Sequence, residues 1–300
     1  MGRTQGVSLV ERAKNEVPGF AELLHKVERR MTLSGNSLKT LVCYGRSLAQ
    51  MALHFGRSPV EVDEEEVQEY LYLLAKQKDF SESYFKFSVY ALRYAYRTIG
   101  LDSKRLDLPE MKKRQTLPVV LSRQECRRLF KAPTLLKHRI VLSLIYSAGL
   151  RLNEVRNLLL TDIDSDRMQI RIRQGKGNKD RYVTLSPLML RGLRDYFLAC
   201  RPVKYLFNGP TAGEPFAERG LQWLLKEAVR KAGIKKDVTL HTLRHTYATH
   251  LLEDGVDIVT IKDQLGHTRI ETTMLYLHIA QVRRLLPHSP LDTLYGKKKG

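Results

Sequence analysis

The sequence predicts a mainly α-helical protein with one small antiparallel β-sheet, divided into two domains. Apolar residues recur at three- and four-residue steps through most of the chain, which is the period of amphipathic helices. The two-residue alternation that indicates a strand is clearest around residues 168–185. Prolines and a basic run interrupt both patterns at residues 103–120, where we expect a linker. These observations predict an N-terminal helical domain followed by a mixed α/β domain.

Charge and cysteine usage restrict the class of protein. The 300 residues carry a formal net charge of +19. Such an excess of positive charge repels itself unless a polyanion relieves it, which makes nucleic acid the leading class of partner. The plain alternative explanation of the charge is a generally basic proteome. No signal-peptide pattern and no apolar run long enough for a membrane are found, so we expect a cytoplasmic protein with no membrane partner. The three cysteines are far apart and form neither a metal-ligand pair nor a disulfide framework.

The N-terminal region is expected to be a helical bundle. Residues 1–20 show no strong period and are assigned to an N-terminal arm or short lead-in helix, and residues 21–102 to the bundle. Glycines and capping residues delimit the expected helices, which run from Ser37 to Gly56, from Asp63 (with Glu66 completing a capping box) and from Ser81 to Gly100.

Basic residues on these helices suggest a domain that clamps DNA through its phosphates, although a plain helical domain is the simpler interpretation. The candidate DNA-binding residues here are Lys39, Arg46, Lys86 and Arg93. The linker adds the basic run Lys112, Lys113 and Arg114, which could follow the DNA backbone but is more often simply solvated.

The second half begins with a capping box, Ser122 with Glu125, and an apolar helix over about residues 135–147. Gly149 ends that helix, and Arg151 follows at the junction with the next amphipathic run. Packing on both sides suits an arginine that must hold a phosphate in fixed geometry. Glu154, three residues later on the same face, could orient it.

The period-two stretch predicts a hairpin. Residues 168–172 form the first strand, residues 175–180 the turn, and residues 182–185 the return strand. Lys176, between two glycines in the turn, could donate a proton to a leaving oxygen, and Lys179 could contact DNA. A plain basic turn is the simpler interpretation of this segment taken alone.

The remaining helices carry the other candidate residues. Ser186 and Pro187 open one helix, residues 221–232 form another, and residues 239–253 form a third with His241 and Arg244 near its start. The free N–H groups there favour an anion. A short helix over residues 258–265 leads through Gly266 into His267, and Thr268 with Glu271 is expected to cap a last helix that carries Tyr276.

Each of these residues also has an ordinary structural interpretation. His241 and His245 are four residues apart, but Thr242 stands where a metallopeptidase needs Glu and no cysteine is nearby, so no metal is expected. Tyr276 in an apolar helix would usually belong to the core, and His267 after a glycine could merely cap the preceding helix. The joint pattern is far more specific than any one of its members.

Five motifs resemble the tyrosine recombinase (phage integrase) family, close to its compact Xer-type members and similar to integron integrases. In order they are Ala148 to Glu154, Gly175 to Lys179, His241 to His245, Leu265 to His267, and Tyr276. The resemblance covers about residues 35–280. It implies a core-binding domain at residues 21–102, a catalytic domain at residues 121–282 and a tail at residues 283–300.

The resemblance also implies site-specific recombination through a 3′-phosphotyrosine intermediate, with Tyr276 as nucleophile. Arg151 and Arg244 would clamp the phosphate, His267 would support them, Lys176 would protonate the leaving oxygen and His241 would take the tyrosine proton. No cofactor is implied. Expected partners are double-stranded DNA, three further copies in a tetramer, and a partner recombinase or accessory protein, with the enzyme nucleoid-associated as in bacteria and phages. A type IB topoisomerase and a catalytically silent DNA-binding protein remain alternatives.

Overall fold

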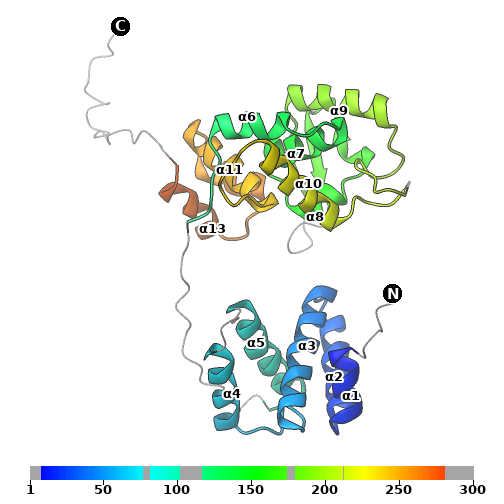
Figure 1. The fold of residues 1–300 in the computed structure, drawn as a ribbon, viewed down its shortest axis with the longest axis vertical. Helices are drawn as coiled ribbons and strands as arrows, with labels where there is room; N and C mark the ends of the chain where they lie inside the picture. Colours follow the sequence, from blue (N-terminus) through cyan, green and yellow to red (C-terminus); the bar gives the residue numbers. More distant parts are fainter. Residues whose placement is uncertain (1–7, 77–81, 102–116, 174–179, 212, 281–300) are drawn as a thin grey trace, which may run out of the picture. The chain divides into compact units, whose positions relative to one another are not determined.

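The computed structural model describes residues 8–76, 82–101, 117–173, 180–211 and 213–280, and the chain divides into two units, residues 1–113 and 114–300 (Figure 1). Lys112, Lys113, Arg114, Lys176 and Lys179 lie outside the described residues, as do most of the expected linker and the tail at residues 283–300. Within the described ranges, every helix is too short or too polar to cross a membrane.

The N-terminal unit is a helical bundle, as predicted. Its helices are α1 (Leu9–Glu16), α2 (Phe20–Leu33), α3 (Leu38–Phe55), α4 (Glu64–Lys76) and α5 (Glu82–Thr98). The expected boundaries of α3 and α4 are confirmed. Ser37 Oγ accepts the N–H of Thr40, Gly56 has a φ of 65°, and Asp63 and Glu66 hydrogen-bond each other's backbone N–H.

The sequence analysis left two alternatives for residues 1–20, an N-terminal arm or a short lead-in helix, and the structure has the helix, α1. Ala13, Val17 and Phe20 are buried in the core of the unit, so the bundle begins before residue 21. Helix α2 was not predicted as an element. Charged residues surround the few apolar positions of α1, and eight residues give too few turns for the period to stand out.

The C-terminal unit combines a three-stranded sheet with helices (Figure 1). Its elements are α6 (Arg123–Lys131), α7 (Leu136–Ala148), α8 (Leu152–Arg156), η1 (Leu160–Asp162), β1 (Ile163–Asp164), β2 (Gln169–Ile172), β3 (Arg181–Thr184), α9 (Pro187–Cys200), α10 (Glu218–Lys231), α11 (Leu240–Glu253), α12 (Ile258–Leu265), α13 (Glu271–Met274) and η2 (Leu275–His278). The mainly helical class with a small antiparallel sheet is therefore confirmed.

The sheet has the order β1-β2-β3 and is antiparallel throughout, with Ile170 opposite Val183. Those two residues and Ile172 are buried, so the period-two pattern correctly identified the face that packs on the helices. The capping box of Ser122 with Glu125, the glycine end of α7 and the serine-proline start of α9 are also confirmed. The two-residue strand β1 was too short to predict.

The end of the described chain differs from its prediction. Helix α13 follows Ile270, with no side-chain cap, so Thr268 does not open it. The N–H groups of Thr273 and Met274 both bond to the carbonyl of Ile270, which starts the first turn two residues after Thr268. The chain then tightens into the 3₁₀ helix η2, which carries Tyr276.

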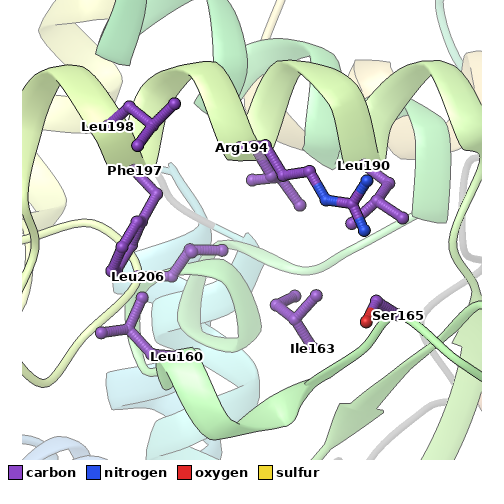
Figure 2. Close-up of a pocket in the computed structure, with 9 residues that line it drawn as sticks. Leu160, Ile163, Ser165, Leu190, Arg194, Phe197, Leu198 and Leu206 are labelled. Carbon is purple, nitrogen blue, oxygen red and sulfur yellow. The ribbon is translucent and has the colours of Figure 1, made fainter.

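An apolar pocket of about 490 Å³ opens between α9 and the β1 region (Figure 2). Its walls include Leu190, Phe197 and Leu198 from α9, and Leu160 and Ile163 from η1 and β1. None of the candidate catalytic residues lines it, so its size alone does not make it the functional site.

Candidate active site

Arg151 lies at the sharp corner between α7 and α8. Gly149, with a φ of 60°, ends α7, and Arg151 is the N-cap residue of α8. Its Nη1 is 2.7 Å from Glu154 Oε1, and its backbone N–H donates to Glu154 Oε2 at 2.8 Å. Its Nη2 also donates to the carbonyl of Gly266 at 3.2 Å. The predicted contact with Glu154 is present, and the guanidinium is held from two sides.

Arg244 meets the same corner from α11. Its side chain is fully buried, and Nη1 and Nη2 donate to the carbonyls of Gly149 and Leu265, the first at 2.6 Å. Its Nη1 lies 3.9 Å from Glu154 Oε2, so the structure brings Arg244 and Arg151 to one carboxylate. Its Nε has no hydrogen-bond partner among the described residues. A buried donor without a partner costs free energy that an anionic ligand could recover.

Glu154 has a third arginine partner that sequence reasoning missed. Arg181, the first residue of β3, contacts both carboxylate oxygens at 2.8 and 2.9 Å and donates Nε to the carbonyl of Gln264 at 3.0 Å. Burial alone would raise the pKa of Glu154, but the hydrogen bonds and charge of Arg181, followed by those of Arg151, hold it at about 2. The carboxylate is therefore ionised at neutral pH. The sequence analysis left Arg181 between the turn at residues 175–180 and the strand at residues 182–185 and gave it no role, because its partner lies 27 residues away.

The histidines of this site are electrically neutral. His267 Nδ1 hydrogen-bonds Thr273 Oγ1 at 2.9 Å, and burial followed by the charges of Arg244 and Arg151 lowers the His267 pKa to about 3. His241 is exposed at the start of α11, where desolvation and the same two arginines lower its pKa. A neutral imidazole can donate one hydrogen bond and accept another, which suits support of a phosphate or transfer of a proton.

Tyr276 is buried, with 2% of its surface exposed, and its partner is a histidine. The Oη atom lies 3.0 Å from Nδ1 of His245, and the His245 ring lies 4.4 Å from that of His241, centroid to centroid. The sequence analysis gave the proton-accepting role to His241 and considered His245 only as a metal ligand. Burial raises the pKa of Tyr276, and the charges of Arg244 and Arg151 counteract this rise.

A hollow of about 580 Å³ adjoins the cluster. Arg151 and His241 line it together with the basic residues Lys226 and Lys236. The capped start of α11 also contributes, because Thr239, whose Oγ1 accepts the N–H of Thr242, lies on the wall. Lys236 is paired with Glu125 at 2.7 Å and Asp237 also lines the hollow, so Arg151 and Lys226 carry the positive charge of this surface.

The four N-terminal candidates lie on α3 and α5. Lys39 and Arg46 are exposed on α3, whereas Lys86 and Arg93 are half-buried on α5. Exposure permits phosphate contacts for the first two, and DNA binding by all four stays a prediction.

Comparison with known proteins decides the family. Residues 101–283 match the phage integrase family, and residues 23–102 match the phage integrase N-terminal SAM-like domain. The chain belongs to the phage integrase family. This integrase-family chain is 38% identical over 98% of its length to the protein y4qK of Sinorhizobium fredii, named as an integrase/recombinase and covered over 95% of its length.

Two further similarities agree with this assignment. A tyrosine recombinase of Thermosipho africanus is 33% identical over 87% of this chain and 94% of its own. The crystal structure of the XerH site-specific recombinase bound to a palindromic difH substrate shares the fold, with a TM-score of 0.67 and 19% identity over 91% of this chain and 84% of that one. This integrase-family chain is a tyrosine-type site-specific recombinase that cleaves and rejoins DNA strands. The topoisomerase and silent DNA-binding alternatives are not favoured.

Proposed function

We propose that Tyr276 attacks a phosphodiester of duplex DNA and forms a 3′-phosphotyrosine bond with release of a 5′-hydroxyl. The observation that carries this proposal is the convergence of Arg151 and Arg244 on Glu154, beside a hollow with further basic residues. Guanidinium groups from two separate elements can then contact both nonbridging oxygens of one phosphate. The energy of the broken phosphodiester is kept in the new ester, so the reverse attack rejoins strands.

Arg151 and Arg244 would stabilise the transition state more than the bound substrate. Negative charge on the nonbridging oxygens grows as phosphorus becomes five-coordinate, and fixed donors stabilise it without further reorganisation. Their many contacts with backbone carbonyls and Glu154 supply that fixed geometry. His267, oriented by Thr273, would add a hydrogen bond to the same oxygens. Lys176 would donate the proton that the leaving 5′-oxygen needs, and His241 would assist at the rim of the site.

Double-stranded DNA is the proposed partner, supported by the DNA-bound state of the similar XerH structure and by the net charge of +19. The proposed contacts of the N-terminal unit are those of Lys39, Arg46, Lys86 and Arg93 with phosphates. Assembly into four protomers, exchange through a Holliday junction and a partner recombinase or accessory protein belong to the same proposal. The domain boundaries after residue 102 in the sequence analysis are also proposed. The boundary at residue 20 is not kept, because α1 packs in the core of the N-terminal unit.

Covalent trapping tests the proposed chemistry. The full chain is incubated with a library of nicked duplexes of random sequence, in which loss of a short strand prevents religation. We expect a denaturant-resistant protein–DNA adduct whose attachment maps to Tyr276, and none with Tyr276→Phe at unchanged DNA affinity. An equal yield of adduct from Tyr276→Phe would refute the nucleophile. Sequencing the trapped DNA would also reveal the target site.

A further inference from the structure

We propose that His245 is a catalytic residue that holds the hydroxyl of Tyr276 and accepts its proton during attack on DNA. The inference rests on the proposed nucleophilic role of Tyr276. It assigns the first proton transfer to His245 on α11, and leaves His241 to other contacts at the rim of the site.

The contact has the geometry that a general base requires. The distance of 3.0 Å between His245 Nδ1 and Tyr276 Oη lies within the range of about 2.6–3.2 Å expected for such a pair. Helix α11 and η2 pack directly against each other, and Leu243, Ala248 and Leu252 of α11 are buried. A rigid, buried helix therefore fixes the imidazole against the reacting oxygen.

Before attack, each partner of the pair is in the protonation state from which the transfer starts. Burial, followed by the charges of His241 and Arg244, lowers the pKa of His245 to about 4, so the imidazole is neutral at pH 7. Burial raises the pKa of Tyr276, so its hydroxyl keeps the proton until attack begins. A neutral imidazole with its proton on Nε2 leaves the Nδ1 lone pair free to accept the hydrogen bond from Oη.

Cleavage exchanges one phosphorus–oxygen bond for another and moves two protons. The Tyr276 oxygen forms a bond with phosphorus while the bond from phosphorus to the 5′-oxygen breaks. The hydroxyl proton passes to Nδ1 of His245, and the leaving 5′-oxygen receives a proton from the proposed acid, Lys176. For strand rejoining, the 5′-hydroxyl attacks phosphorus and gives its proton back to the neutral amine of Lys176. The bond from phosphorus to the Tyr276 oxygen breaks, and His245 returns its proton to Oη.

A second pair on the same helix supplies a matched control. His250 Nδ1 lies 2.8 Å from the Oη of Tyr146, and His250 is 5% exposed. This pair has the chemistry of the first one but contacts none of the arginines Arg151, Arg181 and Arg244 through a described hydrogen bond. If a buried histidine–tyrosine bond mattered only for folding, substitution in the two pairs would have similar consequences.

The test measures the single-turnover rate of covalent-adduct formation on a trapped target duplex. We expect His245→Gln to lower this rate by about 10²–10⁴-fold, the usual contribution of a general base, at unchanged DNA affinity. His250→Gln should leave the rate near that of the unsubstituted protein. Incorporation of trifluorotyrosine at position 276 should recover at least tenfold in His245→Gln, because a more acidic phenol needs less help to lose its proton.

Several outcomes would overturn the inference. These are an unchanged rate in His245→Gln, an equal loss in His250→Gln, or a defect that trifluorotyrosine leaves undiminished. Nitrogen-15 NMR of histidine in the unsubstituted chain tests the assignment without any variant, and a proton on Nδ1 of His245 would contradict it. If Tyr276→Phe still formed the adduct, the proposed function itself would fail, which is a result distinct from a failure of His245 alone.

Discussion

Arg181 and Glu154 form a bidentate ion pair, with Nη1–Oε1 and Nη2–Oε2 distances of 2.8 and 2.9 Å. Glu154 also binds Arg151, so the orientation of Arg151 depends on a residue that needs no contact with DNA. Arg181 further binds the carbonyl of Gln264 just before the Gly266 corner. One guanidinium thus connects β3, α8 and the end of α12.

Removing this guanidinium should impair both stability and catalysis. The side chains of Arg181 and Glu154 are 12% and 6% exposed, and breaking a buried pair from one side costs roughly 3 kcal/mol or more. We expect Arg181→Gln to lower the free energy of unfolding by about 3 kcal/mol. We also expect slower adduct formation at saturating DNA, since Arg151 loses its fixed geometry. Denaturant unfolding and single-turnover trapping measure the two effects.

The hairpin itself provides the control for that substitution. Arg171 on β2 pairs with Asp180, but both side chains are largely exposed, so Arg171→Gln should change stability and cleavage little. Arg181→Lys should restore charge without the bidentate geometry and therefore recover only part of the rate. Equal behaviour of the two Arg→Gln variants would show that the pair with Glu154 has no special role.

Acid should destabilise the catalytic unit in two stages. His245 and His267 have folded pKa values of about 4 and 3, below the unfolded value of about 6.5, so the unfolded chain binds more protons and stability falls from pH 6.5 downwards. Glu154 contributes on the order of 3 kcal/mol above its unfolded pKa of about 4.3, which is lost as pH falls towards 2.

Unfolding in denaturant at a series of pH values checks both stages. His267→Gln should flatten the decline between pH 6.5 and 4 without removing the decline below pH 4. A pH dependence identical to that of the unsubstituted chain would show that His267 is not held neutral by the fold.

Gly149 should not tolerate a side chain. Its φ is 60°, and an added Cβ would lie 2.5 and 2.6 Å from two ring carbons of Tyr247. We expect Gly149→Ala to unfold more easily and to cleave more slowly, because Arg244 donates to the Gly149 carbonyl. Thermal unfolding and adduct formation report the two effects.

Gly255 provides a control that separates backbone strain from steric overlap as causes of the instability expected for Gly149→Ala. It has a φ of 86° but no atom within 4 Å of an added Cβ, so Gly255→Ala incurs only the backbone cost of about 1 kcal/mol. A loss in Gly149→Ala no larger than that in Gly255→Ala would exclude steric overlap with Tyr247.

Thr273 is predicted to orient His267. It is fully buried, and its Oγ1 lies 2.9 Å from His267 Nδ1. Thr273→Val keeps the shape but removes a hydrogen bond of about 1 kcal/mol, so the cleavage rate should fall by roughly fivefold while DNA affinity is kept. Thr273→Ser should retain most of the rate. A fall in DNA affinity that accounts for the whole rate loss would contradict an orienting role.

The sequence predicted what depends on local pattern and missed what depends on distant contacts. Helices α7, α9 and α12 have clear apolar faces and explicit ends, so their positions follow from nearby residues. Arg181 was assigned to neither the predicted turn nor the predicted strand, and no local pattern marks it, because its partner Glu154 belongs to another element. Tyr276 was placed on an α-helix, since local pattern does not distinguish that from the 3₁₀ turn observed.

The choice between histidines shows the same limit. His241 and His245 are one turn apart on α11, and sequence spacing cannot tell which one faces a tyrosine 31 residues further along. The family resemblance favoured the first, whereas packing of η2 against α11 brings the second to the hydroxyl. Such an assignment requires the tertiary structure.

Three guanidinium groups surround a single carboxylate in the free protein, which leaves positive charge in excess inside the catalytic unit. A phosphate bound there would neutralise part of that excess and so become a component of the native fold as well as a reactant. Sulfate- or phosphate-rich buffers should therefore extend the shelf life of the purified enzyme beyond what the same ionic strength of chloride achieves.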